Sequence, residues 1–574
     1  MINNKKLKDI VNSAKSVGVI GSPSSTGRIN VDILETAINE RLIGNLGIFN
    51  YLQNENEHFA LSQFTEITMR NTWSEDPTIR GLIRQKGTIA PITEKQDVHL
   101  AQMTVSSVFS SESQEIIPSI LGTIPPTGTP VKLFNEDIMN SLFAHLSDQL
   151  FYLGKSYGTD IKMPMWFKHF GKGEQGANEA YHLGVFGKTG SGKSYLSLMI
   201  MLAYARHSEM GLFVLDPQGE FSEKINSNPQ IRSLITQTFN KKVKFVSLHN
   251  LVLSGWDLFK KIMIYSDFFK DLGIHHETNQ MQAANELVRI LKCENPKSIK
   301  TWETYKDGAF ERFWFEMKKE SIIARIYSSQ DLRNRVSDSF SEDNKAEIKE
   351  KWNKVCNLFK YEGKEYSIII SKLVKEIQEE KGNISIIDLS EMAIPDDLFW
   401  NETIKFIVIG EFVKQLTNIA EESYKAGNLL NTLVVIDEAH RLAPREKSPI
   451  EDLELLKARF IDGVRTTRKY GLGWMFISQT LSSLDRRIVE QIRIYLFGFG
   501  LSWGIERQAL LEIIGGQNEA LKLYQMFKDP QSALGKREFP FMTIGPISPL
   551  SFSGTPLFFN ALDFPHEFMK VNFQ

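Results

Sequence analysis

A phosphate-binding loop constrains the fold of this chain more than any other feature. Residues 187–194 read Gly-Lys-Thr-Gly-Ser-Gly-Lys-Ser, which matches the pattern G-x-x-x-x-G-K-[ST]. In such a loop, glycines let backbone N–H groups surround a phosphate chain, the lysine reaches the β- and γ-phosphates, and the serine holds Mg²⁺. A short apolar run (183–186) precedes the loop and an apolar stretch of helical length (195–205) follows it. This order predicts a parallel-sheet α/β fold with a nucleotide at a helix N-terminus.

The loop and the residue after it are the predicted contacts of ATP. They are Gly187, Lys188, Thr189, Gly190, Ser191, Gly192, Lys193, Ser194 and Tyr195. Lys193 also counts as catalytic because it reaches the phosphates at which the charge develops. Ser194 is a predicted ligand of Mg²⁺. The alternative, a flexible surface loop, does not account for the strand-like and helix-like runs on either side.

A second motif lies far downstream in the sequence. Residues 433–436 form an apolar, β-branched run that is typical of a strand buried on both faces, and Asp437 and Glu438 follow it. We predict that Asp437 holds Mg²⁺ and that Glu438 polarises the attacking water. The alternative is that Glu438 is an acid at a helix N-terminus, where the helix dipole stabilises its charge.

Three more residues complete the predicted catalytic set. Gln479 follows a strand-like run at 471–478, a position from which a side chain can sense the γ-phosphate, although a simple turn residue is the alternative. Arg465 and Arg468 belong to a basic segment, and an arginine at a subunit interface is suited to neutralising developing phosphate charge. The sequence leaves open which arginine serves and whether it acts within its own subunit or across an interface. A solvated basic turn is the alternative.

Changes in sequence texture predict five segments. Short strand-like runs split by turns indicate a β-barrel at the N-terminus, and helical spacing with high charge indicates a helical bundle inserted into the core. The end of the chain is aromatic and rich in proline and glycine, as expected of an extended arm. In chain order we expect a barrel at 1–150, a linker at 151–180, a core at 181–254 and 383–534 with the bundle at 255–382 between its halves, and an arm at 535–574.

Composition limits the possible functions. A chain of 574 residues exceeds what one core supports, so several domains are expected. Its 67 basic and 69 acidic residues give a net charge of −2, so any nucleic-acid contact must be local or multiplied by symmetry. The sequence shows no long apolar membrane span and no secretory signal. Two cysteines, Cys293 and Cys356, fit a reducing cytoplasm.

The motifs together resemble the HerA family, RecA-like hexameric ATPases that move DNA and are related to FtsK. The matching segments are 186–194, 216–221 (Asp-Pro-Gln-Gly-Glu-Phe), 435–441 (Val-Ile-Asp-Glu-Ala-His-Arg), 468–471 and 477–479. The resemblance implies a RecA-like P-loop ATPase core with an N-terminal β-barrel and an inserted helical bundle, which agrees with the segments above. The chain departs from the family where it carries Gln218 after Asp-Pro and Thr480-Leu481 after Gln479. These departures suggest a bacterial branch.

The resemblance also implies a function. It predicts a homo-hexameric, ATP-hydrolysing ring that moves double-stranded DNA through its pore. The ring is expected to serve a separate effector, a nuclease or a sirtuin-type NAD-consuming enzyme, in cytoplasmic anti-phage defence. Candidate DNA contacts are Arg441, Arg445 and Lys447, for which a solvated loop is the alternative. Two other functions stay open: a nucleotide-gated scaffold that assembles an effector with little translocation, and an FtsK- or conjugation-type motor without an effector. The β-rich N-terminus and the missing membrane span speak against the second.

Overall fold

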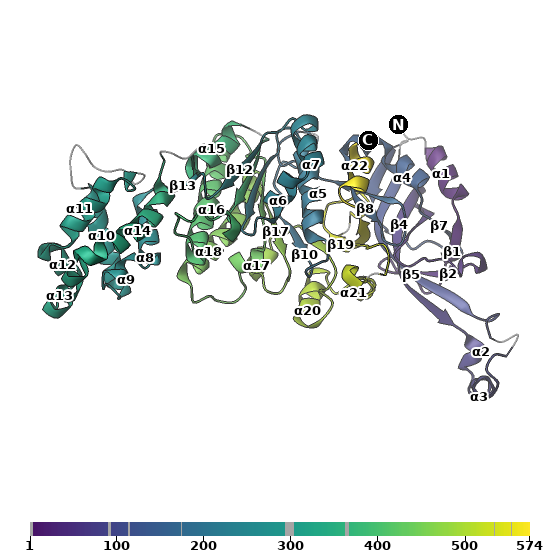
Figure 1. Ribbon diagram of the computed structural model, residues 1–574. Helices are drawn as coiled ribbons and strands as arrows, with labels where there is room; N and C mark the ends of the chain where they lie inside the picture. Colours follow the sequence, from purple (N-terminus) through teal and green to yellow (C-terminus); the bar gives the residue numbers. More distant parts are fainter. Residues whose placement is uncertain are drawn as a thin grey trace. The chain divides into compact units, whose positions relative to one another are not determined.

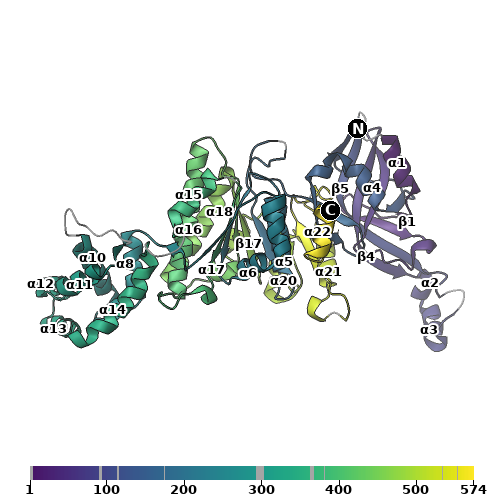
Figure 2. The ribbon, with the colours of Figure 1, turned by 45° about the horizontal axis from the view of Figure 1, so that its top comes forward.

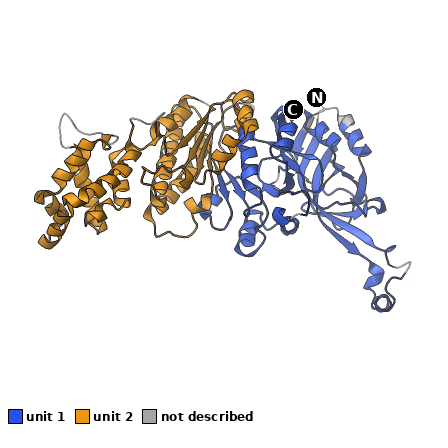
Figure 3. Cartoon of the chain, viewed as in Figure 1, with its two compact units in different colours: residues 1–169, 181–204, 476–574 blue, residues 170–180, 205–475 orange. Residues whose placement is uncertain are grey.

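The chain is divided into two units (Figure 3). Unit 1 comprises residues 1–169, 181–204 and 476–574, and unit 2 comprises 170–180 and 205–475. The chain passes between them near the end of helix α5 (Lys193–Ala205) and inside strand β17 (Leu472–Ser478). The computed structural model describes residues 4–89, 93–112, 115–173, 175–292, 303–361, 367–380, 382–532, 534–552 and 554–573.

Six strands of unit 1 close into an antiparallel β-barrel, as predicted (Figure 1). Around the barrel they follow the order β2, β1, β7, β3, β4, β5, and β5 pairs back onto β2, while β6 pairs with β5. Their bounds are β1 Ser16–Ile20, β2 Ile29–Ile33, β3 Leu46–Gln53, β4 Asn56–Arg70, β5 Val98–Glu112, β6 Glu115–Ser119 and β7 Pro130–Leu133. The tight turn between β3 and β4 forms because Asn54 and Glu55 adopt left-handed φ values of 51° and 66°. Figures 1 and 2 show β4 and β5 continuing beyond the barrel to helices α2 (Thr72–Glu75) and α3 (Pro77–Lys86).

A further group of strands in unit 1 carries the phosphate loop. Strand β10 (Leu183–Phe186), buried at every residue, is parallel to β18 (Ile494–Phe497). Beyond β18 the strands are antiparallel, in the order β19 (Pro540–Ile544), β20 (Leu557–Ala561), β8 (Leu150–Ser156) and β9 (Lys162–Trp166). The parallel pair positions the loop at the carboxyl end of a buried strand.

Two segments differ from the sequence prediction. The expected linker, 151–180, contains most of β8 and all of β9, and the expected arm, 535–574, contains β19, β20 and helix α22 (His566–Phe573). These strands are short, and β20 pairs with β8, which lies at the other end of the core in sequence. A pairing of that kind leaves no local signature in either segment.

Unit 2 holds a parallel sheet in the order β12 (Val243–Ser247), β15 (Ile384–Asp388), β11 (Gly211–Asp216) and β16 (Thr432–Ile436). All residues of β11 and β16 are buried, which explains their unbroken apolar runs. Figures 1 and 2 show helices α15 (Ile370–Glu379), α16 (Glu402–Lys425) and α18 (Glu451–Thr466) along one side of this sheet.

The predicted helical insertion is present in unit 2. It gathers helices α8 Trp256–Tyr265, α9 Phe268–Asp271, α10 Glu277–Lys292, α11 Asp307–Met317, α12 Glu320–Ile326, α13 Gln330–Ser339 and α14 Glu342–Cys356. Its core is aromatic: the rings of Phe259, Phe268, Phe310 and Phe313 lie 5.1 to 6.3 Å from that of Trp352. The buried indole N–H of Trp352 is satisfied by the carbonyl of Thr304 at 3.1 Å. The predicted fold class, α/β with a P-loop core, an N-terminal β-barrel and a helical insertion, is therefore confirmed.

Two compositional points can be placed on the structure. In the ranges that the structure describes, no helix has the length and apolarity needed to cross a membrane. Cys356 is a free, buried thiol at the end of α14, and burial raises its pKa. Cys293 lies outside the described residues.

Candidate nucleotide site

The phosphate loop in unit 1 has a defined backbone. Gly187, Gly190 and Gly192 have φ values of 154°, 82° and 87°, a region that glycine adopts without strain. The Lys188 N–H donates to the carbonyl of Phe499 at 3.0 Å, and the Ser191 N–H donates to the carbonyl of Lys188 at 3.1 Å. Helix α5 then begins at Lys193, so the loop ends on the positive end of a helix dipole.

Two side chains of the loop fit an anionic ligand. The Lys193 ammonium donates to the carbonyl of Lys188 at 3.1 Å, which turns the charge toward the loop. Ser191 is 1% exposed, and its hydroxyl has no hydrogen-bond partner among the described residues. A buried hydroxyl without a partner is unfavourable unless a ligand or water satisfies it. A phosphate oxygen inside the loop would do so.

Gln479 lies against the tip of this loop. Strand β17 ends at Ser478, and the Thr189 hydroxyl donates to the Gln479 side-chain oxygen at 3.2 Å. The structure thus brings together two predicted site residues that are far apart in sequence. Tyr195, on the first turn of α5, is 47% exposed, and its ring lies 5.9 Å from that of Phe564.

The C-terminal part of unit 1 also reaches the loop, which sequence reasoning missed. A Cβ added to Gly190 would lie 2.1 Å from the amide nitrogen of Gln531, and one added to Gly192 would lie 2.8 Å from the ring of Phe539. Neither residue belongs to a motif, so no local signal identifies it.

Unit 2 supplies an acidic cluster at one end of its parallel sheet. Leu215 on β11 pairs with Ile436 on β16, so the next residues, Asp216 and Asp437, emerge at the same edge. Burial, with the nearby charges of Glu438 and Asp216, raises the pKa of Asp437 to about 7. Burial raises the pKa of Asp216 to about 6, although the Ser222 N–H that donates to it opposes the shift.

The cluster was only partly predicted. The sequence predicts roles for Asp437 and Glu438, whereas Asp216 and Glu220 stand out in it only as part of a family motif. The charges of Glu438, Asp216 and Glu220 all help to raise the pKa of Asp437. The sequence does mark Asp216, because an Asp-Pro pair ends the apolar run of β11. It does not show that β11 lies beside β16, since that pairing joins segments far apart in the chain.

The acidic cluster offers one carboxylate that suits a cation. One carboxylate oxygen of Asp437, Oδ2, is buried and has no hydrogen-bond partner among the described residues, which fits a ligand of Mg²⁺. Within the same residues, no group of three or more His, Cys, Asp or Glu side chains is arranged to hold a metal ion. A Mg²⁺ ion at Asp437 therefore requires ligands of another kind, such as a hydroxyl, phosphate oxygens and water, which is the usual coordination of Mg²⁺ in nucleotide sites.

Glu438 has an unusual backbone. Its φ and ψ are 48° and 42°, in the left-handed region, and it immediately precedes helix α17 (Ala439–Leu442). Its side chain makes no capping hydrogen bond to that helix, but its place directly before the helix leaves the N-terminal acid alternative open. Its Oε2 lies 3.3 Å from Nδ1 of His440.

The two predicted arginines lie on the surface of unit 2. Arg465 is in the last turn of α18 and is exposed. The Arg468 side chain is 57% exposed, and its Nε lies 3.3 Å from the carboxylate of Glu179. Neither observation assigns a catalytic role, so both remain predictions.

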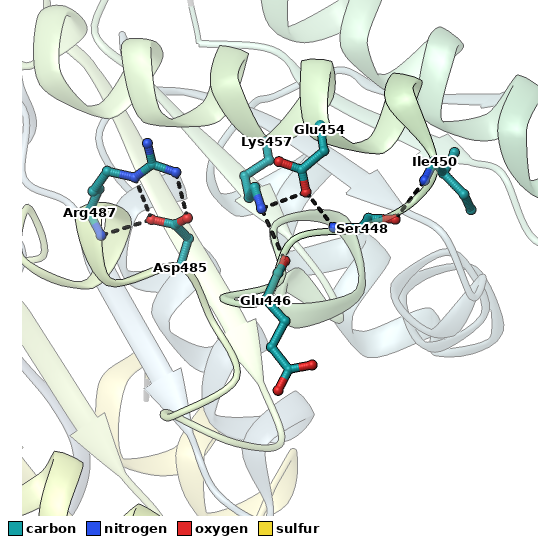
Figure 4. A network of polar contacts seen from close by, with 7 residues as sticks. All are labelled: Glu446, Ser448, Ile450, Glu454, Lys457, Asp485 and Arg487. Atoms are coloured by element: carbon teal, nitrogen blue, oxygen red, sulfur yellow. Dashed lines mark hydrogen bonds and ion pairs between the residues drawn. The ribbon is translucent and has the colours of Figure 1, made fainter.

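The loop after α17 is held in place by a buried lysine (Figure 4). The Lys457 ammonium donates to the carbonyl of Glu446 at 3.1 Å and to the carboxylate of Glu454 at 2.7 Å. The same carboxylate accepts the N–H of Ser448 at 2.7 Å, and these contacts hold the pKa of Glu454 below its usual range. In unit 1, Figure 4 shows a second ion pair, in which two guanidinium nitrogens of Arg487 donate to Asp485 at 3.0 and 2.8 Å.

Residues 178–406 match the sequence model of the family described as helicase HerA, central domain. The DNA double-strand break repair helicase HerA of Sulfolobus acidocaldarius is 22% identical over 379 residues, which cover 64% of this chain and 62% of the relative. The protein of the same description from Sulfurisphaera tokodaii is 24% identical over 420 residues, covering 71% and 69%. The chain thus spans less than two thirds of the first of these HerA relatives.

Among solved structures, VirB4 of Thermoanaerobacter pseudethanolicus is 15% identical and covers 73% of this chain and 97% of its own. Its TM-score of 0.40 is too low to support a conclusion about this chain. The predicted HerA resemblance is confirmed by the family match, whereas a role in defence stays a prediction.

Proposed function

We propose that this protein hydrolyses ATP and uses the energy to move double-stranded DNA. The phosphate loop carries the proposal: its glycines hold positive φ values, its lysine is turned inward and its buried Ser191 hydroxyl lacks a partner among the described residues. The HerA family match of the segment that contains the loop supports the same conclusion.

Each predicted residue has a distinct role in this proposal. Lys193 and the loop N–H groups bind the phosphates and stabilise the charge that develops on them. Ser194 and Asp437 would hold Mg²⁺, which neutralises phosphate charge when it is bound. Glu438 accepts a proton from the attacking water. Gln479, beside Thr189, senses the γ-phosphate, and Arg468 or Arg465 supplies a further positive charge.

ATP hydrolysis is tested by a pair of lysine variants. Lys193→Met should abolish ATP binding or turnover, because the methionine keeps the length of the side chain and removes its charge. Lys536→Met is the matched control, since Lys536 is exposed in the same unit. Phosphate release and binding of a fluorescent ATP analogue are measured for both. Equal turnover in wild type and Lys193→Met would contradict the proposed site.

DNA movement is supported by the similarity to HerA proteins, which are DNA double-strand break repair helicases, and by basic residues around helix α17. Arg441 is exposed on α17 itself, Arg445 and Lys447 are exposed in the loop after it, and Lys457 fixes that loop. In a hexameric ring these few charges would be repeated around a pore, which reconciles DNA binding with a net charge of −2.

DNA stimulation of the ATPase provides the test. Stimulation should weaken steeply as salt rises, because phosphate contacts release counterions. A triple Arg441, Arg445 and Lys447 to Ala variant should lose stimulation and keep its basal rate. If DNA does not stimulate the wild type at low salt, the nucleotide-gated scaffold is the better description.

We extend the proposal to a cytoplasmic homo-hexamer that serves a separate effector, a nuclease or a sirtuin-type NAD-consuming enzyme, in anti-phage defence. A pull-down from the native host followed by native mass measurement with ATP tests it. A ring carrying either enzyme would support the extension. A lone ring would leave the motor and remove the effector, and a monomer with ATP and DNA present would contradict the ring itself.

A further inference from the structure

A pocket lies in unit 2 where the helical insertion meets helix α18 of the core. Its volume is about 440 Å³, and small-molecule sites measure roughly 300–1,000 Å³. Apolar side chains form part of its wall, namely Ile264, Met281 and Leu455. Its charged lining residues are four acids, Asp267, Glu277, Glu451 and Asp452, and two lysines, Lys261 and Lys270. None of these residues belongs to the ATP site or the DNA contacts proposed above, so the pocket needs an explanation of its own.

Asp452 brings an unsatisfied carboxylate oxygen to this pocket. The residue is 5% exposed, and its Oδ1 accepts a hydrogen bond from the Lys261 ammonium at 3.0 Å. Its Oδ2 is buried and has no hydrogen-bond partner among the described residues. A buried carboxylate oxygen without a donor is unfavourable. A ligand that carries an N–H into the pocket would satisfy it.

The two lysines of the lining are already neutralised within the pocket. Lys261 pairs with Asp452 at 3.0 Å, and Lys270 pairs with Asp267 at 2.6 Å. With four carboxylates and two ammonium groups in the lining, two acids are left over. The pocket therefore attracts positive charge, and the donor that Asp452 lacks is best supplied by a cation.

The two remaining acids come from opposite sides of the pocket. Glu277 lies in the first turn of α10 and Glu451 in the first turn of α18, and neither forms an ion pair in the part of the chain that the structure describes. Burial and then the acidic groups of Asp452, Glu451 and Glu277 raise the pKa of the Tyr265 phenol, so the three carboxylates surround one ring. Among the described residues, no group of three or more His, Cys, Asp or Glu side chains is arranged to hold a metal ion. An organic cation thus fits these carboxylates better than a metal ion does.

We propose that this pocket binds an aliphatic polyamine. One ammonium group of the ligand donates to Oδ2 of Asp452, and its outer ammonium groups lie beside Glu277 and Glu451. The methylene chain between them packs against the apolar part of the wall. Because α10 belongs to the insertion and α18 to the core, the bound ligand ties the two together. The proposal does not depend on ATP hydrolysis or on DNA movement.

Titration calorimetry of the full chain with spermidine, at low salt and without nucleotide, tests the site. Asp452→Asn should weaken binding by about 10-fold or more, because it removes the charged acceptor of a charge-assisted hydrogen bond. Lys261 then loses its partner, but its side chain is 42% exposed and water can solvate it. Thermal unfolding shows whether this variant is folded.

A pair of double variants separates the pocket from the general charge of the protein. Glu277→Gln with Glu451→Gln should weaken spermidine binding by about threefold or more, since two nearby charges are lost. Glu320→Gln with Glu342→Gln is the matched control, because both residues are exposed and lie in the first turn of helices of the same unit. This control removes the same charge and should leave the affinity within about twofold.

Three results would overturn the proposal. One is a wild type without saturable spermidine binding. Another is equal weakening in the two double variants, which would mean that spermidine responds to net charge and not to the pocket. The third is displacement of spermidine by Mg²⁺ at matched ionic strength, which would indicate a metal site. If Asp452→Asn does not fold, the exposed glutamates decide the question by themselves.

Discussion

Replacing Gly190 by alanine tests whether the phosphate loop binds ATP through its backbone. Gly190 has φ 82°, and a residue with a Cβ in the left-handed region costs about 1–2 kcal/mol. The added Cβ would also lie 2.1 Å from the amide nitrogen of Gln531, but that side chain is exposed and can rotate away. The backbone cost therefore decides the outcome.

That cost sets the expected loss of affinity. The alanine loop relaxes to a less strained conformation, and ATP binding must then restore the original one to align the N–H groups. The binding free energy should fall by up to the strain, about 1–2 kcal/mol, which corresponds to about 5- to 30-fold in Kd. Titration of a fluorescent ATP analogue measures it directly.

A second glycine provides a matched control. Gly128, before β7 in the barrel, also has φ 82°, and an added Cβ there meets nothing within 4 Å. Gly128→Ala should lower the unfolding free energy of unit 1 in urea by a similar amount and leave ATP affinity unchanged. If Gly190→Ala binds ATP as tightly as the wild type while losing the same stability as Gly128→Ala, the loop backbone does not hold the phosphates.

Three further predictions concern other parts of the two units. Gln479→Ala should lower kcat by about 10-fold or more with little change in ATP affinity, because a γ-phosphate contact matters most in the transition state. Thr189→Val should lower kcat less. Steady-state phosphate release measures kcat for both variants, and binding of a fluorescent ATP analogue measures affinity. Mixing Arg468→Ala with Glu438→Ala subunits should restore phosphate release at about a quarter of interfaces at equal ratio if the arginine acts across the interface, and no recovery at any ratio would point to a role within one subunit or none. Lys241→Met should lower the unfolding free energy by about 2–4 kcal/mol, since the buried Lys241 ammonium donates to three backbone carbonyls at 2.7 to 3.0 Å. Burial lowers the pKa of Lys241 from 10.5 to about 8, so between these pH values the unfolded chain binds more protons than the folded one. Wild-type stability should therefore rise with pH in this range. Urea titrations at several pH values should find no such rise in Lys241→Met.

The phosphate loop was predictable because its sequence encodes a backbone conformation. Three glycines at fixed spacing mark three positive φ values, and the apolar runs on either side mark a buried strand and a helix. Each of these signals lies within a short stretch of sequence, so it can be recognised without knowing which distant segments pack together. The same holds for Asp437 and Glu438, which follow a strand whose residues are all buried.

The acidic cluster was less predictable because it depends on strand order. Asp216 approaches Asp437 only because β11 pairs with β16, and the sequence between these strands includes β12, β15 and the whole helical insertion. The contact of Thr189 with Gln479 has the same character, since it joins residues from distant segments of unit 1. Sequence motifs named these residues but could not show which pairs meet.

The linker and the extended arm were mispredicted for one shared reason: each is the other's partner. Strand β8 pairs with β20, with Phe559 opposite Ser156, and the side chain of Asn572 on α22 bonds the backbone of Tyr152 in both directions, at 2.8 and 2.9 Å. Lys155 on β8 adds an ion pair with Glu567 at 2.8 Å. Both segments contain short apolar runs, at 150–153 and 557–559, but nothing in either run identifies the other as its partner. Truncating residues 557–574 should therefore expose β8 and lower the stability of unit 1, rather than remove a dispensable tail.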